Sequence, residues 1–390
     1  MTHFSSRLKN LKQSDIRAVT RMIKDVDGIN LGQGICDLPV PTAVKRGAQE
    51  AIENDRSIYS SYTGIRRLRE PILEKAQHFN RIPASSPDEV MISAGSTGAF
   101  VTAIFTLLDP GDEAILFEPF YGYHRNLIQL TGAGVSTAPV SAGDNQVDFE
   151  SLVDAINPRT RVIVLNTPTN PTGKVWTREE LERLLQIAQR NDLIVITDEI
   201  YEYMTYDGHE HVSLASLPGA FERTITISGF SKTYNMTGWR IGYAVGPEDL
   251  ISRMGLLNDL FYICAPTPLQ YGVSHAFTMS DQYFEEFQAA YDVRRRMLME
   301  TLEDVGFSFN RPEGAYYILA SFERLRERMP GFEDDARACE TLIRKAGVAT
   351  IPGRSFFEDP QAGAHLLRFC FAKEVPVLEQ ACRQLREAFL

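Results

Sequence analysis

The stretch at residues 161–197 indicates how this chain folds. It contains the apolar run RVIVLN (161–166), the segment REELERLLQIAQRN (178–191) and the apolar run LIVIT (193–197). The two runs lack polar alternation, which is typical of strands buried on both faces of a sheet. The segment between them has the apolar spacing of an amphipathic helix. The stretch therefore predicts two strands of a mostly parallel sheet with a helix packed against them.

The same alternation of apolar runs and helical patterns continues on both sides of this stretch. We therefore expect an α/β fold in which a mostly parallel sheet is flanked by helices. The segments that carry the alternation are EVMIS (89–93) before GAFVTAIFTLL (98–108), AILF (114–117) before YHRNLIQLTG (123–132), TITIS (224–228) and IGYAV (241–245).

From about Asp281 the pattern changes to long amphipathic helices interleaved with the runs AYYILA (315–320) and HLLRFCFA (365–372). This change predicts a smaller α+β domain, and the amphipathic segment from about Ser5 to Asp27 is expected to pack with it. We predict three parts: residues 1–40 as an N-terminal arm and small-domain segment, 41–280 as a large domain that contains the sheet, and 281–390 as a small C-terminal domain.

The composition is that of an ordinary globular protein, with 44% hydrophobic and 23% charged residues among 390. A net charge of -11 disfavours binding to nucleic acid or to an anionic membrane. Five dispersed cysteines without CxxC spacing argue against a disulfide framework or a zinc site. No window of 18 apolar residues is present, and the N-terminus becomes charged early. We therefore expect a cytoplasmic protein without a membrane segment.

Polar and aromatic residues follow the expected strands, where ligands gather in open α/β sheets. Because these strand ends meet at one edge of the sheet, the side chains that follow them are expected to share a pocket. They are Ser96 and Thr97 after EVMIS, Tyr121 after AILFEP, Asn170 after RVIVLN, Asp198 after LIVIT, and Lys232 after TITIS.

Two segments that contain residues of this set indicate a phosphate-binding site. Ser96 and Thr97 begin a predicted helix, where free backbone N–H groups favour an anion, although a Ser or Thr here is more often only a helix cap. The segment SGFSKTYNMTGWRIG (228–242) places Arg240 eight residues after Lys232. Lysine forms Schiff bases and arginine binds phosphate through two hydrogen bonds, whereas the alternative is a solvated lysine beside a structural ion pair.

Taken together, these motifs resemble the class I aminotransferase family, whose fold is that of the aspartate aminotransferase group of pyridoxal phosphate enzymes. The resemblance covers nearly the whole chain. The motifs that carry it are GFSKTYNMTGWRIG around Lys232, NTPTNPTG (166–173), TDEIY (197–201), INLGQG (29–34), PEGAYY (312–317) and LLRF around Arg368.

The resemblance implies that Lys232 carries pyridoxal 5′-phosphate as a Schiff base and that Asp198 faces the pyridine nitrogen of this cofactor. A carboxylate at that position keeps the nitrogen protonated, so that the ring can act as an electron sink. Asn170 and Tyr201 match the residues that bind the cofactor's phenolic oxygen. Lys232, Asp198 and Tyr201 are therefore the predicted catalytic residues.

Further positions follow from the same resemblance. Tyr121 matches the ring that stacks on the cofactor, with Phe120 or Tyr123 as alternatives. Ser96, Thr97, Ser231 and Arg240 are expected to bind the phosphate. Tyr59 matches a tyrosine that reaches the phosphate of the neighbouring subunit, which implies a homodimer with shared active sites. Arg368 resembles the arginine that binds the substrate α-carboxylate, and Gly34 and Asn170 are expected beside it.

Several positions depart from the family pattern. Ile35 and Cys36 replace a polar residue and a proline near the substrate, and Gly229 stands where some relatives carry a phosphate-binding hydroxyl. Ser231 or Ser228 is expected to substitute for that hydroxyl. Thr97 stands where aspartate-type and prephenate-type relatives carry a lysine, so that subgroup is not supported. His209 and His211 lack a further ligand among the next residues, and no metal is expected.

The resemblance implies an aminotransferase of amino acid metabolism and biosynthesis. It moves an amino group between an L-amino acid and a 2-oxo acid, with 2-oxoglutarate as one partner, by a ping-pong mechanism. Two alternatives on the same scaffold remain open: a carbon–sulfur β-lyase and an enzyme similar to 1-aminocyclopropane-1-carboxylate synthase. A more remote alternative is a regulator that senses pyridoxal phosphate, although only about 30 residues precede INLGQG, too few for a DNA-binding arm. The sequence leaves open which side chain the enzyme prefers in its amino acid substrate.

Overall fold

The computed structural model describes residue 5 and residues 15–141 and 144–390. Its largest element is a seven-stranded sheet with the strand order β2-β8-β7-β6-β5-β3-β4. β8 runs antiparallel to both of its neighbours, and the other neighbouring strands are parallel. The strands are β2 (Val90–Ala94), β3 (Glu113–Glu118), β4 (Gly134–Pro139), β5 (Thr160–Asn166), β6 (Ile194–Asp198), β7 (Thr224–Gly229) and β8 (Ile241–Val245).

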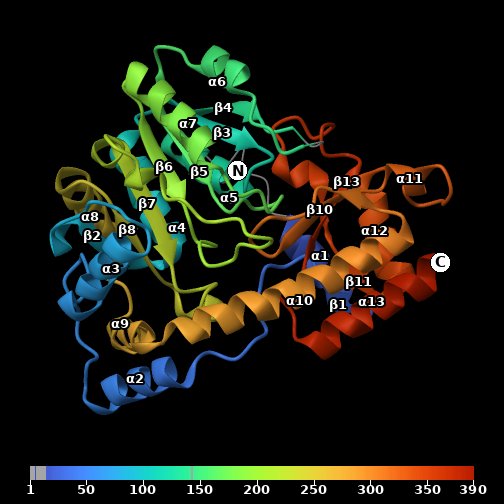
Figure 1. Ribbon diagram of the computed structural model, residues 1–390, viewed down its shortest axis with the longest axis horizontal. Helices are drawn as coiled ribbons and strands as arrows, with labels where there is room; N and C mark the ends of the chain where they lie inside the picture. Colours follow the sequence, from blue (N-terminus) through green and yellow to red (C-terminus); the bar gives the residue numbers. More distant parts are fainter. Residues whose placement is uncertain (1–4, 6–14, 142–143) are drawn as a thin grey trace.

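Helices cover both faces of this sheet (Figure 1). Along β5, Val162 and Val164 pack towards one face, and Ile163 and Leu165 pack towards the other. The first face is covered by α4 (Gly95–Leu107), α5 (Gly122–Thr131) and α8 (Glu248–Tyr262), and the second by α6 (Phe149–Ala155) and α7 (Arg178–Arg190). At the β2 and β8 edge lie α2 (Thr42–Glu53), α3 (Arg66–His78) and α9 (Thr267–Ser274).

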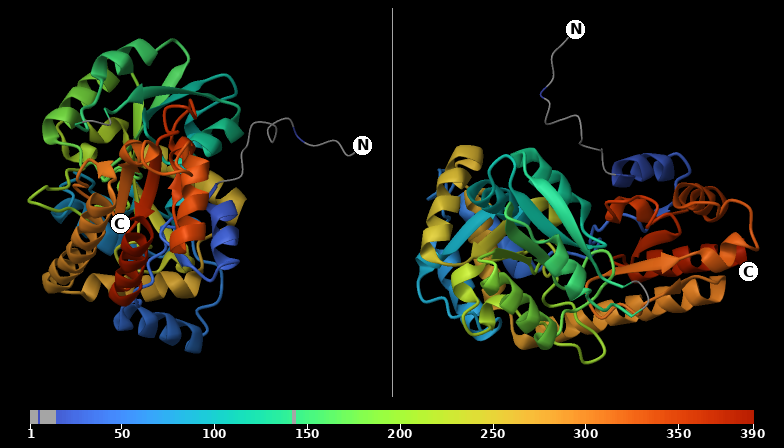
Figure 2. Two further views of the ribbon diagram at one scale, coloured as in Figure 1. Left: turned by 90° about the vertical axis from the view of Figure 1, so that its right-hand side faces the viewer. Right: turned by 90° about the horizontal axis from the view of Figure 1, so that it is seen from above.

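The C-terminal part forms a second, smaller layer beside the large sheet (Figure 2). A four-stranded antiparallel sheet has the order β12-β13-β10-β9. Its strands are β9 (Ser308–Phe309), β10 (Tyr317–Ser321), β12 (Ile351–Pro352) and β13 (Leu366–Cys370). The helices of this part are α10 (Asp281–Val305), α11 (Glu323–Arg326), α12 (Asp335–Ala346) and α13 (Val375–Phe389).

The N-terminal segment joins this smaller part. After α1 (Asp15–Lys24), strand β1 (Ile29–Asn30) pairs in parallel with β11 (Val348–Ala349). Residues 6–14 of the expected amphipathic segment lie outside the described residues. The three predicted domain ranges stay a prediction.

The α/β fold predicted from the sequence is confirmed, with a mixed and mostly parallel sheet and a smaller second domain. Six strands coincide with the apolar runs, but β4 was not expected. Its sequence GVSTAP is mixed in polarity because most residues of β4 are partly or fully exposed, unlike those of β2 at the other edge of the sheet. Within the described part of the chain, no helix has the length and apolar character needed to cross a membrane. All five cysteines lie in this described part, and no disulfide joins any two of them.

A buried arginine ties α10 to the loop that follows β6. The Arg295 side chain is fully buried and donates to both carboxylate oxygens of Asp207, at 2.7 and 2.8 Å, and to the carbonyl of Pro312 at 2.7 Å. The hydrogen bond from Arg295 lowers the pKa of Asp207 to about 2. The charged form of Asp207 is therefore stabilised by folding.

Asp207→Asn is expected to lower the free energy of unfolding by about 1 kcal/mol at pH 7, because Arg295 loses a charged partner that solvent partly screens. A depressed pKa contributes stability above the unfolded value of 3.8, and this stability is lost as the pH falls through about 2. Urea unfolding of both proteins should therefore show a constant difference from pH 7 to pH 4 that shrinks below pH 4. A difference that grows on acidification would contradict this assignment.

Candidate active site

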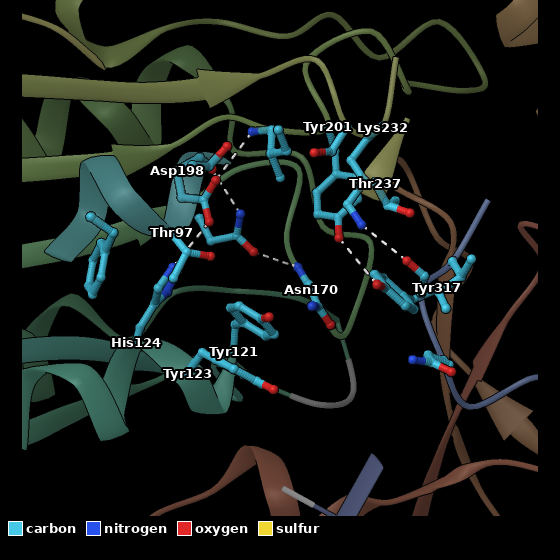
Figure 3. A pocket seen from close by; sticks show the side chains of 18 of the residues that line it. Thr97, Tyr121, Tyr123, His124, Asn170, Asp198, Tyr201, Lys232, Thr237 and Tyr317 are labelled. Carbon is cyan, nitrogen blue, oxygen red and sulfur yellow. Dashed lines mark hydrogen bonds and ion pairs between the residues drawn. The ribbon is translucent and has the colours of Figure 1, made fainter. Parts of the chain in front are cut away.

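A cavity of about 320 Å³ lies where the carboxyl ends of the central parallel strands face the smaller domain. Every site residue predicted from the sequence except Tyr59 lines this cavity, and Figure 3 shows ten of the lining side chains by name. The predicted residues that meet here are Gly34, Ser96, Thr97, Tyr121, Asn170, Asp198, Tyr201, Ser231, Lys232, Arg240 and Arg368.

Lys232 follows β7 and points into the cavity. Its Nζ donates to the carbonyl of Gly34 at 3.1 Å and lies 5.4 Å from the centre of the Tyr316 ring. Burial lowers the pKa of Lys232, with a smaller contribution from Arg240. A lysine with a lowered pKa keeps more of its amine neutral and nucleophilic, which is the form that attacks a carbonyl carbon.

Asp198 ends β6 and is held on the opposite side of the cavity. Its Oδ2 lies 3.1 Å from Nε2 of His124, and the amide of Asn166 donates to its main-chain carbonyl at 2.8 Å. The buried His124 ring lies 4.4 Å from the Phe100 ring and meets the edge of Tyr121, with centroids 5.3 Å apart. The sequence analysis missed His124; its place three residues after Tyr121 was the available signal.

Asn170 and Tyr201 come from the ends of neighbouring strands and approach the middle of the cavity. The main-chain N–H of Asn170 donates to Oδ1 of Asn166 at 2.7 Å, which fixes the turn after β5. The Tyr201 hydroxyl donates to the Tyr317 hydroxyl at 3.2 Å, and burial raises the pKa of Tyr201 well above its usual value. Tyr201 is therefore a neutral hydrogen-bond donor. Tyr317, from the PEGAYY motif, was not predicted as a site residue.

Arg368 lies on β13 and brings a buried positive charge from the smaller domain into the cavity. Its side chain donates to Asn170 Oδ1 at 2.9 Å and to the Gly32 carbonyl at 2.6 Å. The guanidinium carbon lies 4.3 Å from the centre of the Tyr317 ring and 5.0 Å from that of Phe356. Nε of Arg368 is buried and has no partner among the described residues. A buried guanidinium donor without a protein partner is typical of a site that binds an anionic group.

The opposite end of the cavity is built around the N-terminus of α4. Gly95 has a φ of +71°, and a Cβ there would lie 2.3 Å from Arg240 Nη2. The Ser96 hydroxyl donates to the Ser228 carbonyl at 2.9 Å, while Thr97 is exposed at the cavity surface. The first turn of a helix next to an arginine is a site that binds phosphate. Of the two serines that could replace the missing hydroxyl, Ser231 lines the cavity and Ser228 does not.

Tyr121 supplies an aromatic wall between these two ends. Its ring stacks on Tyr123 with centroids 5.2 Å apart and planes at 16°. Tyr123 also lines the cavity, whereas Phe120 is buried in the core and does not. Tyr59 is 76% exposed and lies outside the cavity of its own chain.

These residues fit pyridoxal 5′-phosphate. The cavity offers an amine of lowered pKa for the aldehyde, a carboxylate held by His124 for the ring nitrogen, and an aromatic face. It also offers a helix N-terminus with Arg240 for the phosphate. Arg368 adds a second buried positive charge, and its Nε has no partner within the described part of the chain.

Comparisons with known proteins agree with this chemistry. Residues 26–385 match the family described as aminotransferase class I and II. The aromatic-amino-acid aminotransferase 2 of Thermococcus litoralis is 33% identical, and the match covers 98% of this chain and 97% of that protein. The aspartate aminotransferase of Pyrococcus abyssi is also 33% identical, over 98% and 97% of the two chains.

One solved structure is similar to this chain over nearly the full length of both proteins. The N-succinyldiaminopimelate aminotransferase from Mycobacterium tuberculosis has a TM-score of 0.93 and 32% identity, and the match covers 99% of this chain and 100% of that one. The names of these relatives support transamination over elimination or ligand sensing. The chain therefore belongs to the class I and II aminotransferase family and is a pyridoxal 5′-phosphate-dependent aminotransferase that acts on amino acids and 2-oxo acids.

Proposed function

We propose that the enzyme transfers the amino group of an L-amino acid to 2-oxoglutarate by a ping-pong mechanism through Lys232. The cofactor supplies an electron-withdrawing ring that stabilises negative charge on the substrate Cα. Lys232 is the residue that attaches the cofactor and then moves the proton released at Cα. The lowered pKa of its amine supports this role, because a neutral amine is required to accept that proton.

The remaining side chains hold the reacting groups in place. Asp198, fixed by His124, would keep a proton on the ring nitrogen of the bound cofactor, and Asn170 and Tyr201 would donate hydrogen bonds to its phenolic oxygen. Tyr121 would cover one face of the ring. Ser96, Thr97, Ser231 and Arg240 would bind the phosphate at the N-terminus of α4.

Arg368 fixes the substrate by its α-carboxylate, with Gly34 and Asn170 beside it. A guanidinium binds a carboxylate through two parallel hydrogen bonds, so it sets both the position and the rotation of Cα. Fixing this rotation would determine which bond of Cα is presented for cleavage. Nothing larger than glycine fits at position 34, because a Cβ there would lie 2.0 Å from the Tyr317 hydroxyl.

The observation that carries this proposal is the buried amine of Lys232 in the same cavity as the unpartnered donor of Arg368, as seen in the described residues. The test is a panel of single amino acids added to the purified enzyme loaded with pyridoxal phosphate. Conversion of the cofactor spectrum to the pyridoxamine form, reversed by 2-oxoglutarate, is the expected result. Release of pyruvate and ammonia from a cysteine conjugate, without that conversion, would instead indicate elimination.

We propose further that two copies of the chain form a dimer with shared active sites. An apolar surface on α8 and the loop before α3 supports this arrangement; it comprises Ile58, Tyr59, Leu256, Leu260 and Phe261, which are 45 to 79% exposed. The two segments are in contact, because Asn258 donates to the Tyr62 carbonyl at 2.6 Å. Exposed apolar side chains that gather in this way are typical of a protein interface. Tyr59 is then free to reach the phosphate site of the second copy.

Leu260→Glu is expected to convert the dimer to a monomer, because a charge would be buried in the interface. Light scattering after size-exclusion chromatography measures the mass directly. The monomer should also bind pyridoxal phosphate roughly tenfold more weakly, and Tyr59→Phe should weaken binding within an intact dimer. An exposed position on α13, changed as Glu379→Lys, serves as the control. A wild-type protein that is monomeric at micromolar concentration would contradict the dimer.

A further inference from the structure

A buried carboxylate lies behind the active site and faces away from the cavity. Glu202 follows the cavity residue Tyr201, is 4% exposed, and does not line the cavity itself. Its Oε1 accepts a hydrogen bond from the Ser228 hydroxyl at 2.7 Å, and its Oε2 accepts one from Asn80 at 2.8 Å and an ion-pair contact from Lys75. A buried charge is stable only with such partners, so the position of Glu202 is closely defined.

The charge of Glu202 is maintained by its surroundings. Burial by itself would raise the pKa of Glu202, but Lys75, His211 and the hydrogen bond from Asn80 outweigh burial and lower it. The Nζ of Lys75 also donates to the Tyr243 hydroxyl at 3.1 Å and lies over the ring of Phe79. Glu202 is therefore an anion at neutral pH.

Ser228 connects this anion to the predicted phosphate site. Ser228 lies in β7, and its hydroxyl is the donor to Glu202. Its main-chain carbonyl accepts the hydrogen bond of Ser96, whose side chain lies at the N-terminus of α4. The chain then reaches Lys232 after only three further residues. A Cβ on the intervening Gly229 would lie 2.8 Å from Ser96 Oγ, so this loop packs directly against Ser96.

The cluster has a second interpretation, as a metal site. Glu199, Glu202 and His211 offer ligand atoms within 4.8 Å of one another. However, Glu199 already accepts from Ser213 at 3.0 Å and contacts His211 at 2.9 Å, and both oxygens of Glu202 accept from protein donors. A cation would have to displace Lys75 from the same carboxylate. The contacts favour a closed hydrogen-bonded network over a metal site.

We propose that Glu202 is a positioning residue for the cofactor phosphate: through Ser228 it sets the place of Ser96 at the N-terminus of α4. This inference rests on the proposed role of the α4 terminus in binding the phosphate. The path from Glu202 to Ser96 consists of two hydrogen bonds, of 2.7 and 2.9 Å, which share one residue. We therefore expect loss of the carboxylate charge to weaken binding of the cofactor phosphate.

The test measures the dissociation constants of pyridoxal 5′-phosphate and of pyridoxal, which lacks the phosphate, for apoenzyme variants. Glu202→Gln is expected to weaken binding of pyridoxal 5′-phosphate on the order of tenfold. Binding of pyridoxal should change much less, because pyridoxal makes no contact with Ser96. Asp207→Asn is the matched control: it also breaks a carboxylate–cation pair with a buried partner, but it lies outside the cavity and should leave both constants unchanged.

A double-mutant cycle tests the path itself. Ser228→Ala removes one hydroxyl and is expected to fold even where Glu202→Gln does not. It should weaken binding of pyridoxal 5′-phosphate to a similar degree. The double variant should have a dissociation constant no higher than that of the single variant that binds pyridoxal 5′-phosphate more weakly. Additive effects, or equal losses for both ligands, would overturn the positioning role. A wild-type enzyme that does not bind pyridoxal phosphate would refute the proposed function, and with it the positioning role of Glu202 that rests on it.

Discussion

Lys232→Ala is expected to lower kcat for transamination by roughly 10⁴-fold or more, the largest effect among the substitutions considered. The variant loses the amine that we propose both attaches the cofactor and moves the proton at Cα. Among the described residues of the cavity lining, the other two basic side chains of this kind, Arg240 and Arg368, carry guanidinium groups and not the primary amine that forms a Schiff base. The measurement is a steady-state assay with the best amino acid of the panel.

Borohydride reduction of the loaded enzyme gives an independent readout. In the wild-type enzyme, the label should map to the peptide that contains Lys232, and in Lys232→Ala it should disappear. Lys345→Ala, at an exposed position on α12, is the control and should retain both label and activity. Labelling at another lysine, or activity within tenfold of the wild type, would be incompatible with the proposed mechanism.

Arg368→Gln is expected to lower kcat/KM for amino acids by roughly 10²- to 10³-fold. The buried guanidinium is the group proposed to bind the α-carboxylate, and a neutral amide offers neither its charge nor its paired donors. Arg368→Lys keeps the charge but loses the planar arrangement of two donors, so we expect it to recover only part of the loss.

Two comparisons separate a substrate effect from a folding effect. Amines that lack the α-carboxylate should react equally poorly with the wild type and with Arg368→Gln, because such amines cannot form the carboxylate–guanidinium contact with either protein. Arg294→Gln is the matched control, because Arg294 is also a buried arginine of the smaller part but bonds to the Lys373 carbonyl and lies outside the cavity. If Arg294→Gln reduced kcat/KM as strongly, the loss would reflect stability and not carboxylate binding.

The central sheet could be predicted because its strands are buried on both faces. In β5, Val162 to Leu165 are all apolar, since each side chain packs against a helix layer. The edge strand β4 has only one neighbour in the described sheet and is half exposed, so its sequence carries no such signal. The strength of a strand's sequence pattern therefore follows its burial.

The contacts of His124 and Tyr317 could not be predicted, for a different reason. His124 meets Asp198 from a helix 74 residues away, and Tyr317 meets Tyr201 from another sheet 116 residues away. Each belongs to a stretch that the sequence analysis had already quoted. Residue type and motif identified the segments, but they do not specify which side chains point at one another.

By itself, the sequence determined the fold class, the family resemblance and many of the residues that line the candidate site. It could do so because buried strands need continuous apolar runs and because several residues of the candidate site follow those strands directly. Only the tertiary structure decided how the residues pair. It brought three pairs into hydrogen-bonding distance: Arg368 of the smaller domain with Asn170, Lys232 with the carbonyl of Gly34, and the Ser228 hydroxyl with Glu202. These contacts join segments that the chain order separates, so their distances depend on how whole layers pack.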